Sequence, residues 1–316
     1  MNNCLQTKVA IVGAGFVGST IAYAFMLQGV AQEIVLIDTK REKAEGEALD
    51  LDHGMQFAHA KRVVGTSDMS YVKDASVVII TAGVAQKPGQ SRSDLLTTNV
   101  GIFKELIPSI TKHNKDCIIL VVTNPLDVLT YVTLKLSGLP SCAVFGAGTV
   151  LDTARLRYLL GLHCNISPKD ITASVLGEHG DSEFVWWSKA CVAGIPIQEM
   201  TTITSAVKRE IHEQTKNAAY EIISKKGATY YSIALVVAKI VRAILLDQSR
   251  VFTVSTMIED LYGVNDVCLS IPTVVRGGGT CQRLPLTLDD QEQSFFKSSA
   301  AKVYADIVLA KKLLDL

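Results

Sequence analysis

The sequence predicts an α/β protein in which a doubly wound parallel sheet is followed by a second, α+β domain. Three observations predict this class. Six short apolar runs alternate with helical segments in the first half, three glycines with GxGxxG spacing follow the first run, and shorter strands with polar turns begin at about residue 150. We therefore expect domains at residues 1–147 and 148–316, packed as one body with a cleft between them.

The first apolar run leads into Gly13, Gly15 and Gly18 and then into a segment of helical composition. On such a strand-to-helix turn, Gly13 permits the tight turn, Gly15 lets the backbone approach a pyrophosphate, and Gly18 lets the helix pack on the strand. The amides of Phe16 and Val17, at the helix N-terminus, would face the phosphates. The pattern predicts a Rossmann-type dinucleotide site.

A second apolar run, residues 33–37, ends at Asp38, which lies 20 positions after Gly18. A carboxylate at the end of the second strand accepts hydrogen bonds from an adenosine ribose and would repel a 2′-phosphate. We therefore predict NAD rather than NADP as the cofactor. The alternative is a glycine turn in an unrelated α/β fold with an acid there by chance.

The other strands of the first domain are expected at residues 62–66, 75–83, 117–123 and 143–146, with a helix over 41–55. These runs lack polar alternation, as is typical of parallel strands covered by helices on both faces. In such sheets, ligands bind beyond the C-terminal ends of the strands.

The second domain is predicted to contain short strands and long helices. Strands are expected at residues 172–176, 184–187, 191–197, 251–258 and 267–275, and helices at 204–225, 229–246 and 289–316. In the last helix, Phe296, Val303, Ile307 and Leu314 fall at helical spacings and are expected to share a buried face.

Composition argues against several classes of protein. The 31 basic and 31 acidic residues cancel, so no positive field would attract nucleic acid. The longest apolar stretch, residues 233–246, is shorter than the roughly 20 residues that span a bilayer. Seven cysteines without CxxC spacing lie largely in apolar runs, which predicts reduced, structural thiols, with Cys4 an exposed exception. No apolar leader precedes the first strand, so we expect a cytoplasmic protein.

Asp152 and Arg155 form the first candidate pair. They stand three residues apart, shortly after Gly146 and Gly148 at the end of the sixth expected strand. On a helix this spacing places both on one face, where a surface ion pair is the alternative interpretation. Their position at a strand end, where this architecture binds ligands, favours a functional role.

His179 is the second candidate. It lies between Gly177 and Gly180, flanked by the acids Glu178 and Asp181, directly after an apolar strand. A single histidine is more often structural, which is the alternative here. Its place on a glycine turn beside a nucleotide site favours acid/base chemistry.

The third candidate is the glycine- and proline-containing loop of residues 83–92. Its alternative interpretation is an ordinary surface connection between strand and helix, although it is longer than most. A polar loop with a cation at its far end predicts a lid that closes and brings Arg92 to the substrate.

Together these motifs resemble those of the L-lactate and malate dehydrogenase family. The matching motifs are Gly13-x-Gly15-x-x-Gly18, Asp38, Gln86 to Arg92, Thr123-Asn124-Pro125, Leu151-Asp152-x-x-Arg155 and Gly177-Glu178-His179-Gly180-Asp181. Their order and spacing match over essentially the full chain. The resemblance implies an NAD-dependent oxidoreductase that acts on a small 2-keto acid, without a metal.

The resemblance implies a role for each charged candidate. His179 is implied to be the proton donor and acceptor, and Asp152 the buried carboxylate that fixes its tautomer and stabilises the imidazolium. A neighbouring carboxylate raises a histidine pKa, so that a proton is available near neutral pH. Arg155 would bind the substrate carboxylate with its planar fork. Arg92 would stabilise negative charge that grows on the carbonyl oxygen.

Polar residues complete the implied site. Asn124 is implied to donate near the same oxygen, with a cis Asn124-Pro125 bond, and Thr229 to line the substrate pocket. The cofactor-binding residues are expected to be Gly13, Gly15, Phe16, Val17, Gly18, Asp38, Thr81, Ala82, Gly83, Asn99 and Asn124.

Gln86 distinguishes the two branches of the family, because malate dehydrogenases carry arginine at this lid position. Oxaloacetate has a second carboxylate, which a neutral lid would strip of water without supplying a cation. We therefore expect reduction of pyruvate to L-lactate, with malate dehydrogenase as the alternative within the family. A catalytically idle NAD-binding protein is the alternative from another class, and the retention of Arg92, Asp152, Arg155 and His179 argues against it.

Two departures limit the resemblance. Arg157 matches an arginine of the fructose 1,6-bisphosphate site of activated bacterial relatives, but Thr172 stands in place of the histidine, which argues against such activation. The chain also lacks the long N-terminal arm of the animal enzymes. A homotetramer is expected by resemblance, with a dimer as the alternative.

Overall fold

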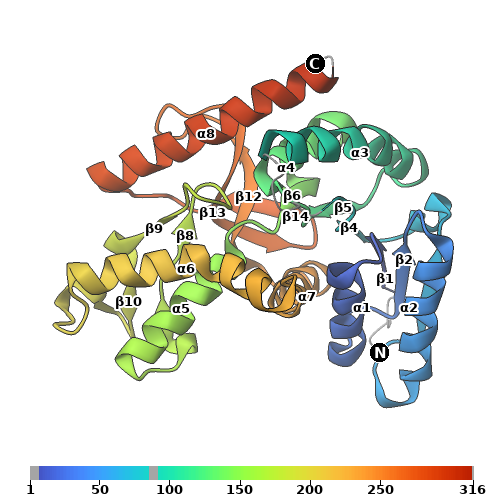
Figure 1. Ribbon diagram of the computed structural model, residues 1–316, viewed down its shortest axis with the longest axis horizontal. Coiled ribbons are helices and arrows are strands. Elements are labelled where there is room, and N and C mark those ends of the chain that lie inside the picture. The colour runs from blue at the N-terminus through green and yellow to red at the C-terminus, as the bar shows by residue number, and fades with distance from the viewer. Residues whose placement is uncertain (1–6, 85–91, 315–316) are drawn as a thin grey trace.

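The structure, a computed structural model, describes residues 7–84 and 92–314, except for the side chain of Arg92 (Figure 1). A nine-stranded sheet runs through the described part of the chain in the order β14-β13-β12-β6-β5-β4-β1-β2-β3. Two smaller sheets lie beside it, one of three strands and one of two.

Six parallel strands form the first part of the large sheet. They are β1 (Lys8–Val12), β2 (Glu33–Ile37), β3 (Arg62–Thr66), β4 (Val77–Ile80), β5 (Ile118–Val121) and β6 (Val144–Gly146). All neighbouring pairs among them are parallel, in the order 3-2-1-4-5-6 seen from one edge to the centre. This is the doubly wound order, so the predicted fold class is confirmed.

Helices cover both faces of this sheet (Figure 1). The α-helices are α1 (Phe16–Gln28), α2 (Arg41–His53), α3 (Arg92–His113), α4 (Leu126–Ser137), α5 (Val150–Cys164), α6 (Ser205–Lys226), α7 (Tyr231–Leu245) and α8 (Asp290–Leu314). Side chains of α3, α4 and α8 share one core with one face of the sheet, and those of α1, α2 and α7 share a second core with the other. Burial on both faces explains the unbroken apolar runs.

The sheet continues into the second half of the chain. Strands β12 (Arg250–Ile258), β13 (Val267–Arg276) and β14 (Gly279–Arg283) extend it by antiparallel pairing. The junction is narrow, because β12 pairs with β6 through Ser255 opposite Gly146. Strand β14 was not predicted from the sequence, because its residues are mostly exposed and polar and carry no apolar periodicity.

The short strands differ from the expected pattern in two places. They are β7 (Ile171–Thr172), β8 (Val175–Leu176), β9 (Phe184–Val185), β10 (Cys191–Val192) and β11 (Ile195–Pro196). The single strand expected over residues 172–176 is wrong, because β7 pairs with β10 whereas β8 pairs with β9. The single strand expected over residues 191–197 is also wrong, because β10 and β11 pair with each other as an antiparallel hairpin. Local sequence cannot show such a change of partner. In Figure 1 these strands lie with α5 and α6 at the lower left, around a third core.

Single turns of 3₁₀ helix connect several of these elements. They are η1 (Met55–Phe57), η2 (Met69–Val72), η3 (Ser141–Ala143), η4 (Pro168–Asp170), η5 (Trp187–Lys189) and η6 (Ile197–Glu199). The predicted face of the last helix is confirmed, because Phe296, Val303, Ile307 and Leu314 are all buried in α8.

The six cysteines of the described residues are all free thiols, whereas Cys4 lies outside them. Cys117 and Cys268 are buried, as suits structural thiols in apolar runs, whereas Cys142 and Cys281 are exposed. Within the described residues, no helix combines the length and the apolar character that a membrane crossing needs.

Candidate active site

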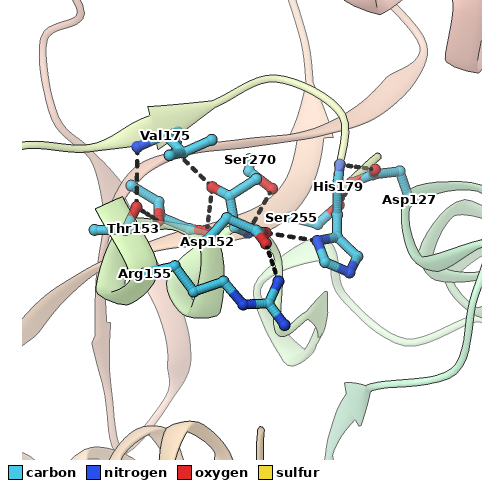
Figure 2. Close-up of polar contacts among 10 residues, drawn as sticks. Asp127, Asp152, Thr153, Arg155, Val175, His179, Ser255 and Ser270 are labelled. Atoms are coloured by element: carbon cyan, nitrogen blue, oxygen red, sulfur yellow. Dashed lines mark hydrogen bonds and ion pairs between the residues drawn. The ribbon is translucent and has the colours of Figure 1, made fainter. Parts of the chain in front are cut away.

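Three of the predicted residues meet at Asp152, in the first turn of α5 (Figure 2). The Nδ1 atom of His179 lies 2.7 Å from Oδ2 of Asp152, and Nη1 of Arg155 donates to Oδ1 at 2.8 Å. Both oxygens of the carboxylate are therefore engaged, one by each partner. Figure 2 shows the imidazole and the guanidinium on the same side of Asp152.

Buried hydroxyls hold α5 against the strand that leads to His179. Thr149, the residue before the helix, donates from Oγ1 to the carbonyl of Val175 at 2.5 Å. One helical turn later, Oγ1 of Thr153 accepts from the amide of Val175 at 3.0 Å. Val175 begins β8, the strand that leads to His179. The two threonines bind both the amide and the carbonyl of Val175, and so fix the separation between Asp152 and His179.

The backbone of His179 is held from a different element. Its amide donates to Oδ2 of Asp127 at 2.7 Å, and Oδ1 of Asp127 accepts from the hydroxyl of Ser255 at 2.6 Å (Figure 2). Asp127 is in the first turn of α4, directly after the cis Asn124-Pro125 bond, which was predicted and is confirmed. Burial raises the pKa of Asp127 to about 6, although Ser255 and the His179 amide oppose this.

The charges at this site favour a protonated imidazole. Burial by itself lowers the pKa of His179, but the charge of Asp152 and the hydrogen bond to it outweigh burial and raise this pKa to about 9. Burial would likewise raise the pKa of Asp152, yet His179 and then Arg155 hold it below its ordinary value. The His179 side chain is 23% exposed, and in the described residues its Nε2 has no hydrogen-bond partner, so Nε2 is free for a ligand.

Arg155 has N–H donors that it does not use for Asp152. Its side chain is 13% exposed and uses Nη1 for Asp152. A guanidinium has five N–H donors in one plane, so further donors remain beside the imidazole. An anion bound there would have a fork of donors and an acid within one site.

The two acids beside His179, Glu178 and Asp181, make structural contacts that hold its turn in place. Oε2 of Glu178 accepts from the amide of Ser182 at 3.1 Å and lies 3.0 Å from the ammonium of Lys302 on α8. Asp181 lies 3.7 Å from the same ammonium and accepts from the hydroxyl of Tyr220 at 3.2 Å. These contacts fasten the turn to α8 and α6.

The glycine turn fits a dinucleotide. Gly13 has φ +111°, and a Cβ there would lie 2.7 Å from Oγ1 of Thr81, while a Cβ on Gly18 would strike the carbonyl of Gly13. By contrast, a Cβ on Gly15 would meet no protein atom within 4 Å. Packing therefore explains two of the glycines but not Gly15, which suits a position where a phosphate approaches the backbone.

Asp38 follows the C-terminal end of β2, beside the glycine turn. Its Oδ2 accepts from the amide of Ala14 at 2.8 Å, and its Oδ1 accepts from the amide of Lys40 at 3.0 Å. The carboxylate is thereby held beside the glycine turn with lone pairs remaining for ribose hydroxyls. Phe16 and Val17 begin α1 directly after Gly15, as expected.

The residues after β4 form the neighbouring wall. Thr81 donates to the carbonyl of Gly13 at 2.9 Å, and the carbonyl of Ala82 accepts from Thr123 at 2.8 Å. Gly83 has φ +154°, and a Cβ there would strike the side chain of Thr123. These bonds join the ends of β1, β4 and β5, where the sequence places the cofactor.

Asn99, on α3, joins two segments of that wall. Its Oδ1 accepts from the amide of Val84 at 2.9 Å, and its Nδ2 donates to the carbonyl of Asn124 at 2.7 Å. Asn99 is fully buried, whereas Asn124 is exposed. The structure therefore gives Asn99 a supporting position and leaves the Asn124 amide open to solvent or ligand.

The structure brings together some predicted residues and leaves others apart. Thr229 lies in the connection between α6 and α7, next to Tyr230, whose ring stacks on Phe16 with centroids 5.3 Å apart. This places the connection beside the glycine turn, but among the described residues no hydrogen bond joins Thr229 to His179. Gln86 lies outside the described residues, as does the side chain of Arg92, whose backbone begins α3.

Two acids near His179 were missed by the sequence analysis. Asp127 follows an Asn-Pro pair into a helix, a weak signal that could have marked it as a helix-start acid. Glu183 lies at the end of the His179 turn, directly before the apolar residues Phe184 and Val185, and is buried. A ligand atom of each of Asp152, His179 and Glu183 lies within 4.8 Å of the others. Since Arg155 and His179 already occupy both oxygens of Asp152, we interpret this cluster as a proton site rather than a metal site.

Comparisons with known proteins agree with this geometry. Residues 7–146 match the family model for the lactate/malate dehydrogenase NAD binding domain, and residues 149–313 match that for the lactate/malate dehydrogenase alpha/beta C-terminal domain. Between them, the two matches cover almost the whole described chain.

Similar proteins support the same assignment. An L-lactate dehydrogenase of Thermoanaerobacterium saccharolyticum is 47% identical over 316 residues, covering 98% of this chain and all of that protein. One of Acetivibrio thermocellus is 48% identical over 94% of this chain and 95% of its own length. The crystal structure of a minor L-lactate dehydrogenase of Enterococcus mundtii superimposes with a TM-score of 0.93 at 41% identity, covering 96% of this chain and 98% of that one. The chain therefore belongs to the lactate/malate dehydrogenase family of NAD-dependent oxidoreductases.

Proposed function

We propose that the protein is an L-lactate dehydrogenase, which reduces pyruvate to L-lactate with NADH and catalyses the reverse reaction. The observation that carries this proposal is the single carboxylate of Asp152 holding both an imidazole and a guanidinium. A 2-keto acid needs a proton for its carbonyl oxygen and a cation for its carboxylate, and these two side chains supply them from adjacent positions.

His179 holds the proton at Nε2. With Asp152 accepting from Nδ1, the imidazole is fixed in the orientation that turns Nε2 away from the carboxylate, toward the substrate oxygen. The raised pKa keeps His179 protonated at neutral pH, ready for keto-acid reduction. In the reverse direction the neutral ring accepts the hydroxyl proton of lactate.

Arg155 binds the substrate carboxylate in this proposal, through the donors that it does not give to Asp152. Arg92 stabilises charge on the reacting oxygen, while Asn124 donates near the same oxygen and Thr229 lines the pocket. NAD, when bound, exchanges a hydride with C2 of the substrate.

The cofactor residues are proposed along the wall described above. The glycine turn, with the amides of Phe16 and Val17, binds the pyrophosphate, and Asp38 binds the adenosine ribose. Thr81, Ala82, Gly83, Asn99 and Asn124 shape the path toward the substrate, with Asn99 acting through its bonds to Val84 and Asn124.

Malate dehydrogenase activity is disfavoured by two independent observations. The similar proteins described above are L-lactate dehydrogenases by name, and Gln86 supplies no cation for a second carboxylate. An idle NAD-binding protein is disfavoured because burying Asp152 with two cationic partners costs desolvation that a merely structural helix start does not require.

Finer features of the whole protein are also proposals. We infer a boundary between cofactor and catalytic domains at residues 147 and 148, a homotetrameric assembly and a cytoplasmic location. The boundary rests on the change to shorter strands with polar turns at about residue 150, and the tetramer rests on the resemblance. The location rests on the sequence before the first strand.

The decisive experiment compares kcat/KM for pyruvate and for oxaloacetate with NADH, by following absorbance of the nicotinamide. Preference for pyruvate is expected. Preference for oxaloacetate would establish the malate alternative, and no NADH oxidation with any short 2-keto acid would establish an idle protein. The control is His179→Asn, which should bind NADH normally while kcat falls by about 10²-fold or more.

A further inference from the structure

Glu183 is a buried carboxylic acid directly beside the Asp152–His179 pair. It lies at the end of the His179 turn, where its amide donates to the carbonyl of Gly180 at 3.1 Å. The residue is only 5% exposed, and Oε1 is buried without a hydrogen-bond partner among the described residues. A carboxyl oxygen of Glu183 lies within 4.8 Å of ligand atoms of both Asp152 and His179.

Packing gives no reason for an acid at this position. Its neighbours Phe184 and Val185 are buried and apolar, and the hydrogen bond from His212 Nε2 on α6, at 3.3 Å, is made to the backbone carbonyl of Glu183 and not to its carboxyl group. A buried polar atom without a partner costs stability. A buried acid at such a cost is typical of a functional group, here one that acts on the charged Asp152–His179 pair beside it.

The charges around Glu183 come from three elements. Asp152 and Arg155 belong to α5, His179 belongs to the same turn as Glu183, and α6 contributes Lys216. On α6, His212 contacts the Glu183 carbonyl, and the exposed Glu213 faces Lys216 at 3.0 Å. His179 is the titratable base in this set closest to the proposed chemistry.

Glu183 and His179 act on each other in opposite directions. Burial, followed by the charge of Asp152, raises the pKa of Glu183 to about 8, and the cations His179, Arg155 and Lys216 oppose that rise. Reciprocally, the carboxylate of Glu183 raises the pKa of His179. The two groups therefore titrate in the same pH range and each favours the charged form of the other.

We propose that Glu183 is a positioning residue whose ionised carboxylate, beside the Asp152–His179 pair, stabilises the protonated form of His179. Glu183 does not touch substrate. It acts when the pH rises and its own proton leaves, because the new negative charge then helps His179 to keep its proton. The consequence for catalysis rests on the proposed lactate dehydrogenase function, whereas the effect on His179 does not.

The test measures the His179 imidazole directly by NMR titration of the protein, with its signal assigned by its absence in His179→Asn. In Glu183→Gln the pKa of His179 is expected to fall by about one unit, the lower end for losing an opposite charge at this distance. The matched control is Glu292→Gln, another buried acid, whose carboxylate accepts from Ser188 at 2.9 Å and 2.7 Å. It should leave the His179 pKa unchanged.

An unchanged or raised His179 pKa in folded Glu183→Gln would overturn the proposal. If this variant does not fold, Glu183→Leu replaces the unpartnered carboxyl by an apolar group of similar size and is judged by the same titration. As a second readout, the alkaline limit of pyruvate reduction should move to lower pH by the same amount. A protein that turned over no keto acid would refute the proposed function, yet the NMR titration would still decide the role of Glu183.

Discussion

Asp152 and His179 meet through a hydrogen bond of 2.7 Å although they lie 27 positions apart in the chain. They come from different elements, α5 and the turn after β8, and the hydroxyls of Thr149 and Thr153 join those elements. The acid/base pair is therefore a product of how the helix start is fixed to the strand.

Asp152→Asn should move the alkaline limit of pyruvate reduction to lower pH. Reduction requires protonated His179, so activity is present below the pKa of His179 and is lost as the pH rises through it. That pKa is about 9 with Asp152 in place and should fall toward the ordinary value of about 6.5 without its charge. The pH dependence of kcat/KM measures the change.

The matched control for this prediction is Asp181→Asn, which removes an exposed acid two residues from His179 that faces Lys302. Its pH limit should stay where it is in the wild type. An Asp152→Asn profile that coincides with that of the wild type would mean that the carboxylate does not govern the proton on His179.

Arg155→Lys should raise KM for pyruvate by roughly 10- to 100-fold, the scale of a lost charge-assisted hydrogen bond. A lysine keeps the charge but cannot serve Asp152 and a substrate carboxylate with one planar fork. Steady-state kinetics with NADH saturating gives the value.

Arg157→Lys is the matched control, because Arg157 lies on the same helix and donates from Nε to the carbonyl of Ala173 at 2.9 Å. Its KM should remain close to the wild-type value. If both lysine variants bind pyruvate as the wild type does, the substrate carboxylate is held by another residue.

NADH should be strongly preferred over NADPH. The Asp38 carboxylate is fixed by the amides of Ala14 and Lys40, so it cannot swing away from a 2′-phosphate. The ratio of kcat/KM for the two cofactors measures this preference, and Asp38→Ser should narrow it by removing the like charge. Equal use of both cofactors by the wild type would show that Asp38 does not face the ribose.

Gln86→Arg should shift preference from pyruvate toward oxaloacetate by about 10³-fold in the ratio of kcat/KM values, because an arginine pairs the additional carboxylate and is left unpaired over a methyl group. Both values come from the same NADH assay.

Lys87→Gln is the control, since Lys87 is the neighbouring cation in the sequence. It should not alter the ratio. A large effect of Lys87→Gln on this ratio, together with no effect of Gln86→Arg, would show that Lys87 and not Gln86 discriminates between the two substrates.

Local chemistry was enough to predict much of this protein. The strand runs, the glycine turn with Asp38, and the buried face of α8 all follow from short-range patterns, because periodicity and backbone requirements act over a few residues. Asp152, Arg155 and His179 could be named for the same reason, since each belongs to a compact motif at a strand end.

The tertiary structure alone decided which distant segments meet. It joined β12 to β6 through Ser255, which in turn binds Asp127 and so holds the backbone of His179. It split the expected strand over residues 172–176 between two sheets, and it placed Glu183 against the acid/base pair. Strand pairing and the environment of a buried charge depend on contacts between residues far apart in the chain, which no local pattern of side chains encodes.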